Sequence, residues 1–115
     1  MSEGDCLFCK MVAGEIPLMR LYDDDLVMAF RDIAPRAPNH ILIIPKQHIA
    51  SANELAAEHD LLLGRLFTAA RRIAADLGLT ERGYRLTFNV GPEGGQTIYH
   101  LHLHLLGGRQ MGPEG

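Results

Sequence analysis

The sequence predicts an α+β domain in which a mostly antiparallel five-stranded sheet is packed by one long helix, with a short helix near the N-terminus. First, a length of 115 residues with 47% hydrophobic and 22% charged side chains suits a single domain, 1–115. Second, strand-like patterns flank one long helical pattern. Third, every link between consecutive strands is too short for a parallel crossover, except the link that holds the long helix. Residues 1–4 and 108–115 are expected to be loose ends.

A short first helix is predicted over residues 6–13. Asp5 is suited to cap its first turn, and Gly14 is suited to end it. Pro17 follows and prevents the helix from continuing, because its ring removes a backbone donor.

The next segments read as three strands and their connections. Residues 21–22 and 26–30 are apolar and are separated by three aspartates, which indicates a hairpin with an acidic turn. Residues 32–39 contain two prolines and are expected to form a loop. Residues 40–44 are a continuous apolar run ended by Pro45, whose length and β-branched content favour a central strand.

A long helix is predicted in the middle of the chain. Ser51 and Glu54 fit a capping box at its start, and Gly78 closes it. Because the whole span is long, we expect a short turn followed by a main helix from near Ala57. The apolar positions that keep helical spacing are Leu55, Leu62, Leu66, Ala70, Ile73 and Leu77.

Two further strands are predicted after this helix. Residues 84–90 and 99–106 both alternate apolar and polar side chains, as half-buried strands do. Residues 91–95 between them are rich in glycine and are expected to form a turn.

Composition and charge exclude several classes of protein. A net charge of −3 and a pI near 6.0 remove the broad attraction to nucleic acid, so no nucleic-acid partner is expected. No apolar run approaches the roughly 20 residues of a membrane helix, so no membrane partner is expected. The acidic N-terminus lacks the apolar stretch of a signal peptide, which favours a cytoplasmic location.

Histidine is the most informative residue type in this chain. Three of its six histidines, His100, His102 and His104, alternate with leucines near the C-terminus. Alternate side chains of a strand share one face, so the three imidazoles would lie together and the leucines would face the core. A polar surface strip and a metal site are the alternatives, since neutral imidazole is a common metal ligand.

The residues flanking these histidines favour a phosphate ligand over a bare cation. Gly94 and Gly95 allow close backbone approach, and exposed N–H groups in such turns bind anions. Asn89, Gln96 and Thr97 add side-chain donors. The alternative is that the glycine-rich stretch is only a hairpin loop.

Two cysteines, Cys6 and Cys9, form a Cys-x-x-Cys pair. In a cytosolic protein such a pair is more often half of a metal site or a redox pair than a structural disulfide. Two small buried apolar residues are the third interpretation.

The pattern of His100 to Leu106 resembles the signature of the histidine-triad (HIT) family, and the resemblance covers nearly the whole chain. Residues 75–79 and 107–111 are similar to its histidine-triad nucleotide-binding, or Hint-like, branch. The other matching blocks are 6–10 with 16–17, 29–33, 37–40, 43–49 and 94–99.

This resemblance implies a homodimeric α+β protein that binds purine nucleotides of the AMP or GMP type. It implies hydrolysis of the P–N bond of nucleoside 5′-phosphoramidates, through a covalent nucleotidyl-histidine on His102. The carbonyl of His100 would fix the tautomer of this nucleophile. His104 would donate to the phosphate, His40 would complete the proton network, and Thr97 would assist the leaving group.

The resemblance also implies a nucleotide site. Asn89, Gly95 and Gln96 would hold the phosphate, and the Asp32 carboxylate would accept from the ribose hydroxyls. The apolar residues matching the base pocket are Leu7, Phe8, Met11, Ile16, Phe30 and Ile33. Ordinary core packing is the alternative for these six.

A bacterial branch of the family carries a structural zinc, and its ligand positions match Cys6, Cys9, His48 and His100 here. Such a closed four-ligand site leaves no position for water, so the reaction itself requires no cofactor. His59 matches no family residue and is expected to be solvated surface.

Two departures bear on the activity. The chain has no tryptophan, whereas the eukaryotic Hint branch carries one in the tail, here residues 112–115, so the leaving group is the least transferable property. His104 stands where the nucleotidyl-transferase branch usually has glutamine, which favours hydrolysis. A dinucleoside polyphosphate hydrolase, a non-catalytic nucleotide-binding regulatory dimer and a metal-binding protein are the alternatives.

Overall fold

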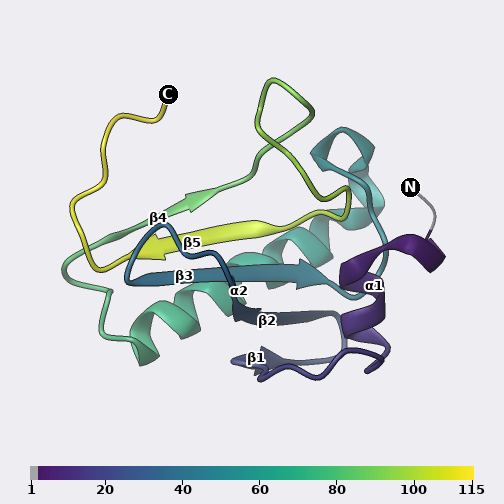
Figure 1. The fold of residues 1–115 in the computed structure, drawn as a ribbon, viewed down its shortest axis with the longest axis horizontal. Helices are drawn as coiled ribbons and strands as arrows, with labels where there is room; N and C mark the ends of the chain where they lie inside the picture. Colours follow the sequence, from purple (N-terminus) through teal and green to yellow (C-terminus); the bar gives the residue numbers. More distant parts are fainter. Residues whose placement is uncertain (1–2) are drawn as a thin grey trace.

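A computed structural model describes residues 3–115 and shows one five-stranded antiparallel sheet with a helix on each side (Figure 1). The strand order is β1-β2-β3-β5-β4, and all four pairs are antiparallel. The predicted α+β class is therefore confirmed. The helices and strands are α1 (Leu7–Val12), β1 (Tyr22–Asp23), β2 (Val27–Arg31), β3 (Asn39–Pro45), α2 (Asp60–Asp76), β4 (Tyr84–Thr87) and β5 (Leu103–Gly107).

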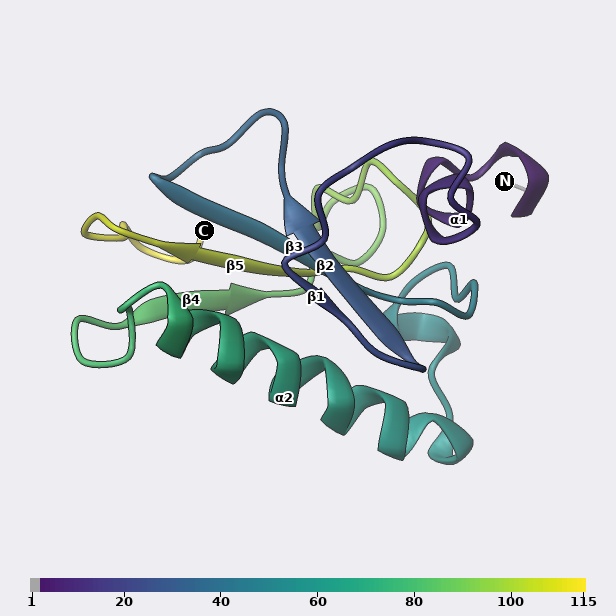
Figure 2. The same cartoon turned by 90° about the horizontal axis from the view of Figure 1, so that it is seen from below.

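The two faces of the sheet build two separate apolar clusters, as Figure 2 shows with α2 below the sheet and α1 above it. Along β3, Ile41 and Ile43 pack with α2, whereas Leu42 and Ile44 join Phe8 of α1. Successive side chains of a strand point to opposite faces, so covering both faces requires the continuous apolar run seen in the sequence. The site described below lies on the α1 side.

The first helix begins one residue later than predicted, and Cys6 rather than Asp5 is its N-cap. The Cys6 Sγ accepts a hydrogen bond from the backbone N–H of Cys9 at 3.4 Å, which satisfies a donor that the first helical turn leaves free. Asp5 instead ends a 3-10 turn over Glu3–Asp5. Residues 1–2 of the predicted loose end lie outside the described residues.

The long helix starts after two 3-10 turns, Ala52–Glu54 and Ala57–His59. Ser51 caps the first of these turns, with its hydroxyl accepting from Asn53 N–H at 3.2 Å, so this cap belongs to the preceding turn and not to α2 itself. The expected combination of a short turn and a main helix is therefore confirmed. None of the helices in residues 3–115 is long and apolar enough to cross a membrane.

The last two strands are shorter than predicted. β4 ends at Thr87 and not at Val90, and β5 begins at Leu103 and not at Tyr99. Between them the chain leaves the sheet as a loop, visible in Figure 1 beyond the end of β4. Only His104 of the three alternating histidines therefore lies within a strand. The alternation nonetheless continues, because Leu101 packs in the same cluster as the leucines of β5.

The C-terminal tail after β5 has no helix or strand, as expected, but it is tied to the domain. Arg85 of β4 donates to the carbonyl of Gly112, and Arg109 donates to the carbonyl of Arg36.

Candidate active site

A cavity of about 890 Å³ opens on the α1 side of the sheet. His102 and His104 lie in its wall, together with Asp32, Asn89 and Thr97. Gly95 and the six residues predicted to hold the base also line it. Of the residues predicted to act on or bind the nucleotide, His40 and Gln96 are absent from the lining.

Several lining residues were not predicted from the sequence, namely Pro17, Leu18, Met19, Leu21, Arg31, Ala34, Arg36, Leu42 and Ile98. Leu42 had a usable signal in the sequence, because alternate side chains of the strand predicted over residues 40–44 place it on the face opposite Ile41 and Ile43. The structure pairs it with Phe30 on the α1 face of the sheet. The others lie mostly in loops, where sequence periodicity carries no information about direction.

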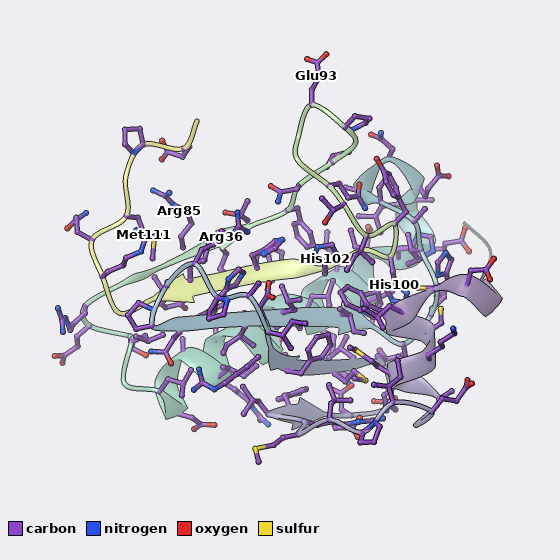
Figure 3. The ribbon with its side chains drawn as sticks, viewed as in Figure 1. Arg36, Arg85, Glu93, His100, His102 and Met111 are labelled. Atoms are coloured by element: carbon purple, nitrogen blue, oxygen red, sulfur yellow. The ribbon has the colours of Figure 1, made fainter. Side chains whose placement is uncertain are left out.

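His102 is held in a defined tautomer. Its Nδ1 lies 2.7 Å from the carbonyl oxygen of His100, which can only accept, so Nδ1 carries the proton. In the neutral ring Nε2 then bears the lone pair. Burial lowers the pKa of His102, and the ring of Phe8 packs edge-on with the centroids 5.3 Å apart. The arrangement gives a neutral imidazole with a free nucleophilic nitrogen beside a cavity. Figure 3 shows His102 and His100 on the segment leading into β5.

His40 and His104 form a second ordered pair. The backbone N–H of Arg36 donates to His40 Nδ1 at 3.1 Å, so the His40 proton must lie on Nε2. That nitrogen is 2.9 Å from His104 Nδ1 and donates to it. By the same logic, His104 carries its own proton on Nε2. His40 thus acts from behind the cavity wall, as a link between a backbone donor and His104.

His104 therefore presents a donor to the cavity. Its Nε2 is buried and has no hydrogen-bond partner among the described residues. Such a buried donor is costly unless a ligand satisfies it. Burial, followed by the nearby His102 and His40, lowers the pKa of His104 to about 4, so the ring is neutral near pH 7.

Asp32 lies at the junction of this pair and the cavity. Its Oδ2 is 3.5 Å from His40 Nε2, while its Oδ1 accepts from the N–H of Ala34 at 2.9 Å. Burial lowers the pKa of His40, and the charge of Asp32 partly opposes this effect. We regard the contact as electrostatic, because His40 Nε2 donates at shorter distance to His104.

The glycine-rich loop is shaped by Gln96 from inside. The Gln96 amide accepts from Gly91 N–H at 3.0 Å and donates to the carbonyls of Ala50 at 2.8 Å and Ile98 at 3.1 Å. These bonds occupy a side chain that was predicted to hold phosphate. They place Gln96 behind the loop, where it directs Gly95 and Thr97 toward the cavity. Gly95 has φ +84°, a conformation that glycine adopts readily.

The four predicted metal ligands converge beside the active site. Their ligand atoms, from Cys6, Cys9, His48 and His100, lie within 4.8 Å of one another. The Sγ–Nδ1 separations are 3.4 Å for Cys6–His100, 3.6 Å for Cys9–His100 and 3.2 Å for Cys9–His48. A tetrahedral zinc with ordinary bond lengths separates sulfur from nitrogen by about 3.6 Å, so two thiolates and two imidazoles fit this ion.

A hydrogen bond behind the cluster orients one of its imidazoles. His100 Nε2 donates to the carbonyl of Pro45 at 2.8 Å, which leaves Nδ1 unprotonated and directed at the sulfurs. The same residue supplies the carbonyl that fixes His102. His100 therefore joins the metal-ligand cluster to the nucleophile.

This fold, with His102 and His104 in the cavity wall and His40 and His100 hydrogen-bonded behind them, defines a hydrolase of the histidine-triad class. The chain belongs to the HIT family: a family model described as "HIT domain" matches residues 13–111. Like the HIT hydrolases it resembles, it is a hydrolase.

Individual relatives agree with this assignment. The chain is 59% identical over 111 residues to an uncharacterized HIT-like protein of Synechococcus elongatus, covering 96% of each chain. It is 52% identical over 109 residues to the purine nucleoside phosphoramidase of Escherichia coli K12, covering 95% of this chain and 92% of that protein.

Solved structures share the fold closely. A HIT family hydrolase from Legionella pneumophila superposes with a TM-score of 0.94 at 53% identity, over 96% of this chain and 100% of the other. A histidine triad protein from Clostridium difficile gives a TM-score of 0.94 at 37% identity, over 100% of both chains.

Proposed function

We propose that the protein hydrolyses the P–N bond of purine nucleoside 5′-phosphoramidates of the adenosine monophosphoramidate type. The observation that carries this proposal is a pair of imidazole nitrogens in the cavity wall with opposite hydrogen-bonding roles. His102 offers an Nε2 lone pair, and the neighbouring His104 offers an Nε2–H without a partner among the described residues. A nucleophile and a donor side by side suit attack on a phosphate. The E. coli relative, named a purine nucleoside phosphoramidase, supports the choice of the P–N bond and of a purine as the nucleobase.

The reaction follows in two displacements. His102 Nε2 attacks the α-phosphorus, and the P–N bond to the amine breaks. The amine leaves with the bonding electron pair and takes a proton, assisted by the Thr97 hydroxyl in the same cavity. His104 donates to a phosphate oxygen as negative charge builds on it. Water then attacks phosphorus, and the bond between phosphorus and His102 Nε2 breaks with its electron pair returning to Nε2. The nucleoside monophosphate is released, and the proton lost by the water replaces the one that the amine took up.

Binding uses the remaining cavity residues. Asp32 accepts from the ribose hydroxyls, while Asn89 and the Gly95 turn hold the phosphate. The predicted base pocket consists of the apolar side chains beside α1. Three exposed large apolar side chains, Leu7, Met19 and Ile33, line the cavity, and Ile33 is 97% exposed. A group of exposed apolar side chains around a cavity suits the binding of a flat aromatic ligand such as a purine base.

We propose a structural zinc held by Cys6, Cys9, His48 and His100. When bound, it would cross-link the start of α1 to the segment before β5 and would hold His100 still. It takes no part in the displacements, since its four protein ligands complete the coordination. We also propose, from the family resemblance, that the protein works as a homodimer in the cytoplasm.

The test compares turnover of adenosine monophosphoramidate with turnover of diadenosine tetraphosphate. We expect a kcat/KM at least about 100-fold higher for the phosphoramidate, and a loss of about 10⁴-fold or more in His102→Ala. Preference for the tetraphosphate would contradict the proposed substrate class. Nucleotide binding without turnover would instead indicate a binding protein. Light scattering of the same sample checks the dimer.

A further inference from the structure

The C-terminal tail is connected to the active-site histidines through a single loop residue. The Arg109 guanidinium donates twice to the carbonyl of Arg36, from Nε at 3.1 Å and from Nη2 at 2.9 Å. On the other side of the same residue, the Arg36 N–H donates to His40 Nδ1. His40 in turn donates to His104. The chain of bonds thus runs from the tail to the donor in the cavity.

The Arg36 loop has little regular structure to hold it. Residues 32–38 between β2 and β3 contain no strand or helix, and most are exposed. The bonds at its start involve Asp32, whose N–H donates to the His40 carbonyl and whose Oδ1 accepts from Ala34. At Arg36, the residue whose N–H sets the His40 tautomer, Arg109 supplies two hydrogen bonds from outside the loop. Without them, the two peptide units that flank the Arg36 Cα have more freedom to rotate, which lets the Arg36 N–H turn away from the ring.

The tail is shaped to reach this loop. Gly107 pairs with Asn39 in the sheet. Gly108 follows with φ +98°, and a Cβ there would lie 2.9 Å from the Cβ of Pro38. Only glycine therefore allows the chain to turn and to lie this close to the loop, which brings Arg109 to the Arg36 carbonyl. Figure 3 shows Arg36 at the same end of the sheet as Met111 of the tail.

We propose that Arg109 is a positioning residue for the hydrolysis: by binding the Arg36 carbonyl it holds the backbone at the Arg36 Cα, so that the N–H of the preceding peptide unit keeps the His40 proton on Nε2, directed at His104. This inference rests on the proposed function of the cavity. Arg109 does not line the cavity and so acts through other groups. The planar guanidinium presents two parallel donors to one carbonyl, which a lysine cannot reproduce.

The variants are Arg109→Ala and Arg109→Lys, with Arg82→Ala as the matched control. Arg82 and Arg109 line the same shallow surface pocket, so each alanine variant removes one positive charge from that surface. We expect Arg109→Ala to lower kcat about tenfold with KM changed less than about twofold, because binding groups stay in place. Arg109→Lys should recover only part of the loss, and Arg82→Ala should match the wild type.

The second readout is the His40 tautomer, measured without substrate by long-range ¹H–¹⁵N correlation and assigned with His40→Gln. We expect one tautomer, protonated on Nε2, in the wild type and in Arg82→Ala, and a mixture in Arg109→Ala. A single unchanged tautomer in Arg109→Ala, or an equal loss in Arg82→Ala, would overturn the inference.

The two proposals can fail separately. If the wild type does not cleave phosphoramidates, the proposed function fails, while the tautomer comparison still decides the role of Arg109. If Arg109→Ala does not fold, Arg109→Lys carries the comparison, because it keeps the charge of this exposed side chain.

Discussion

His104 should make the folding stability of this protein strongly dependent on pH. The ring is only 6% exposed, and its pKa is lowered from 6.5 to about 4 by burial and by the neighbouring His102 and His40. In the unfolded chain the same ring has an ordinary pKa. Between these two values the unfolded state binds a proton that the folded state does not. Stability therefore falls as the pH drops from about 6.5 toward 4.

The size of the effect follows from the shift. At pH 5 the unfolded ring is almost fully protonated and the folded ring is almost fully neutral. Linkage then gives a cost of about 2 kcal/mol relative to pH 7 for this group alone. For a domain of this length, that corresponds to a decrease in Tm of about 8 °C.

The assay is urea unfolding of the wild type and of His104→Gln from pH 7 to pH 5. Glutamine keeps an amide donor but does not titrate, so it changes the stability by an amount that is independent of pH. We expect the free energy of unfolding of the variant to fall by about 2 kcal/mol less over this range. Identical pH dependence in the two proteins would refute the assignment of His104 as a buried neutral ring.

Three other perturbations follow from the same structure. Phe8→Ala removes a ring that is 1% exposed and should cost about 3–5 kcal/mol in urea unfolding, whereas Phe67→Ala, at 38% exposure, should cost clearly less. Gly94→Ala places a Cβ against the Val90 carbonyl oxygen, so the glycine-rich loop must move and, if it holds the phosphate as proposed, KM should rise about tenfold. Its control is the exposed Glu93→Ala at the tip of the same loop, where steady-state kinetics should be unchanged (Figure 3). Elemental analysis should find about one zinc per chain, and its removal by a chelator should lower Tm by about 10 °C in scanning calorimetry; absence of metal and an unchanged Tm would contradict the metal site.

Much of the fold could be predicted because local patterns and the sheet agree. The continuous run of β3 and the alternation of Leu101 with the leucines of β5 match the two apolar clusters on opposite faces of the sheet. The strand ends could not be predicted in the same way. The apolar and polar alternation continues outside the sheet, where residues 98–100 form a bend, because Leu101 still packs in the α2 cluster while His100 belongs to the metal-ligand cluster.

The candidate site, like the fold, could be predicted only in part from the sequence. The triad and the Cys/His group could be identified as sets from residue type and spacing, together with a family resemblance. The tautomers and hydrogen-bond partners of these side chains could not be predicted, because they depend on contacts between residues that are distant in the sequence. Gln96 illustrates this: its amide donates to the carbonyl of Ala50, 46 positions away, and this contact has no local sequence signal. The bond from Arg109 to Arg36 joins residues 73 positions apart and leaves no local signal.

The most direct test of the account is to trap the covalent intermediate. The protein is mixed rapidly with adenosine monophosphoramidate, quenched under alkaline conditions and digested, because a P–N bond to histidine is labile in acid. Mass spectrometry of the peptides then locates any adenylated residue. The account predicts adenylation at His102 and at no other histidine, with none in His102→Ala. An adduct on another residue, or turnover by His102→Ala at the wild-type rate, would contradict the assignment of His102 as the nucleophile.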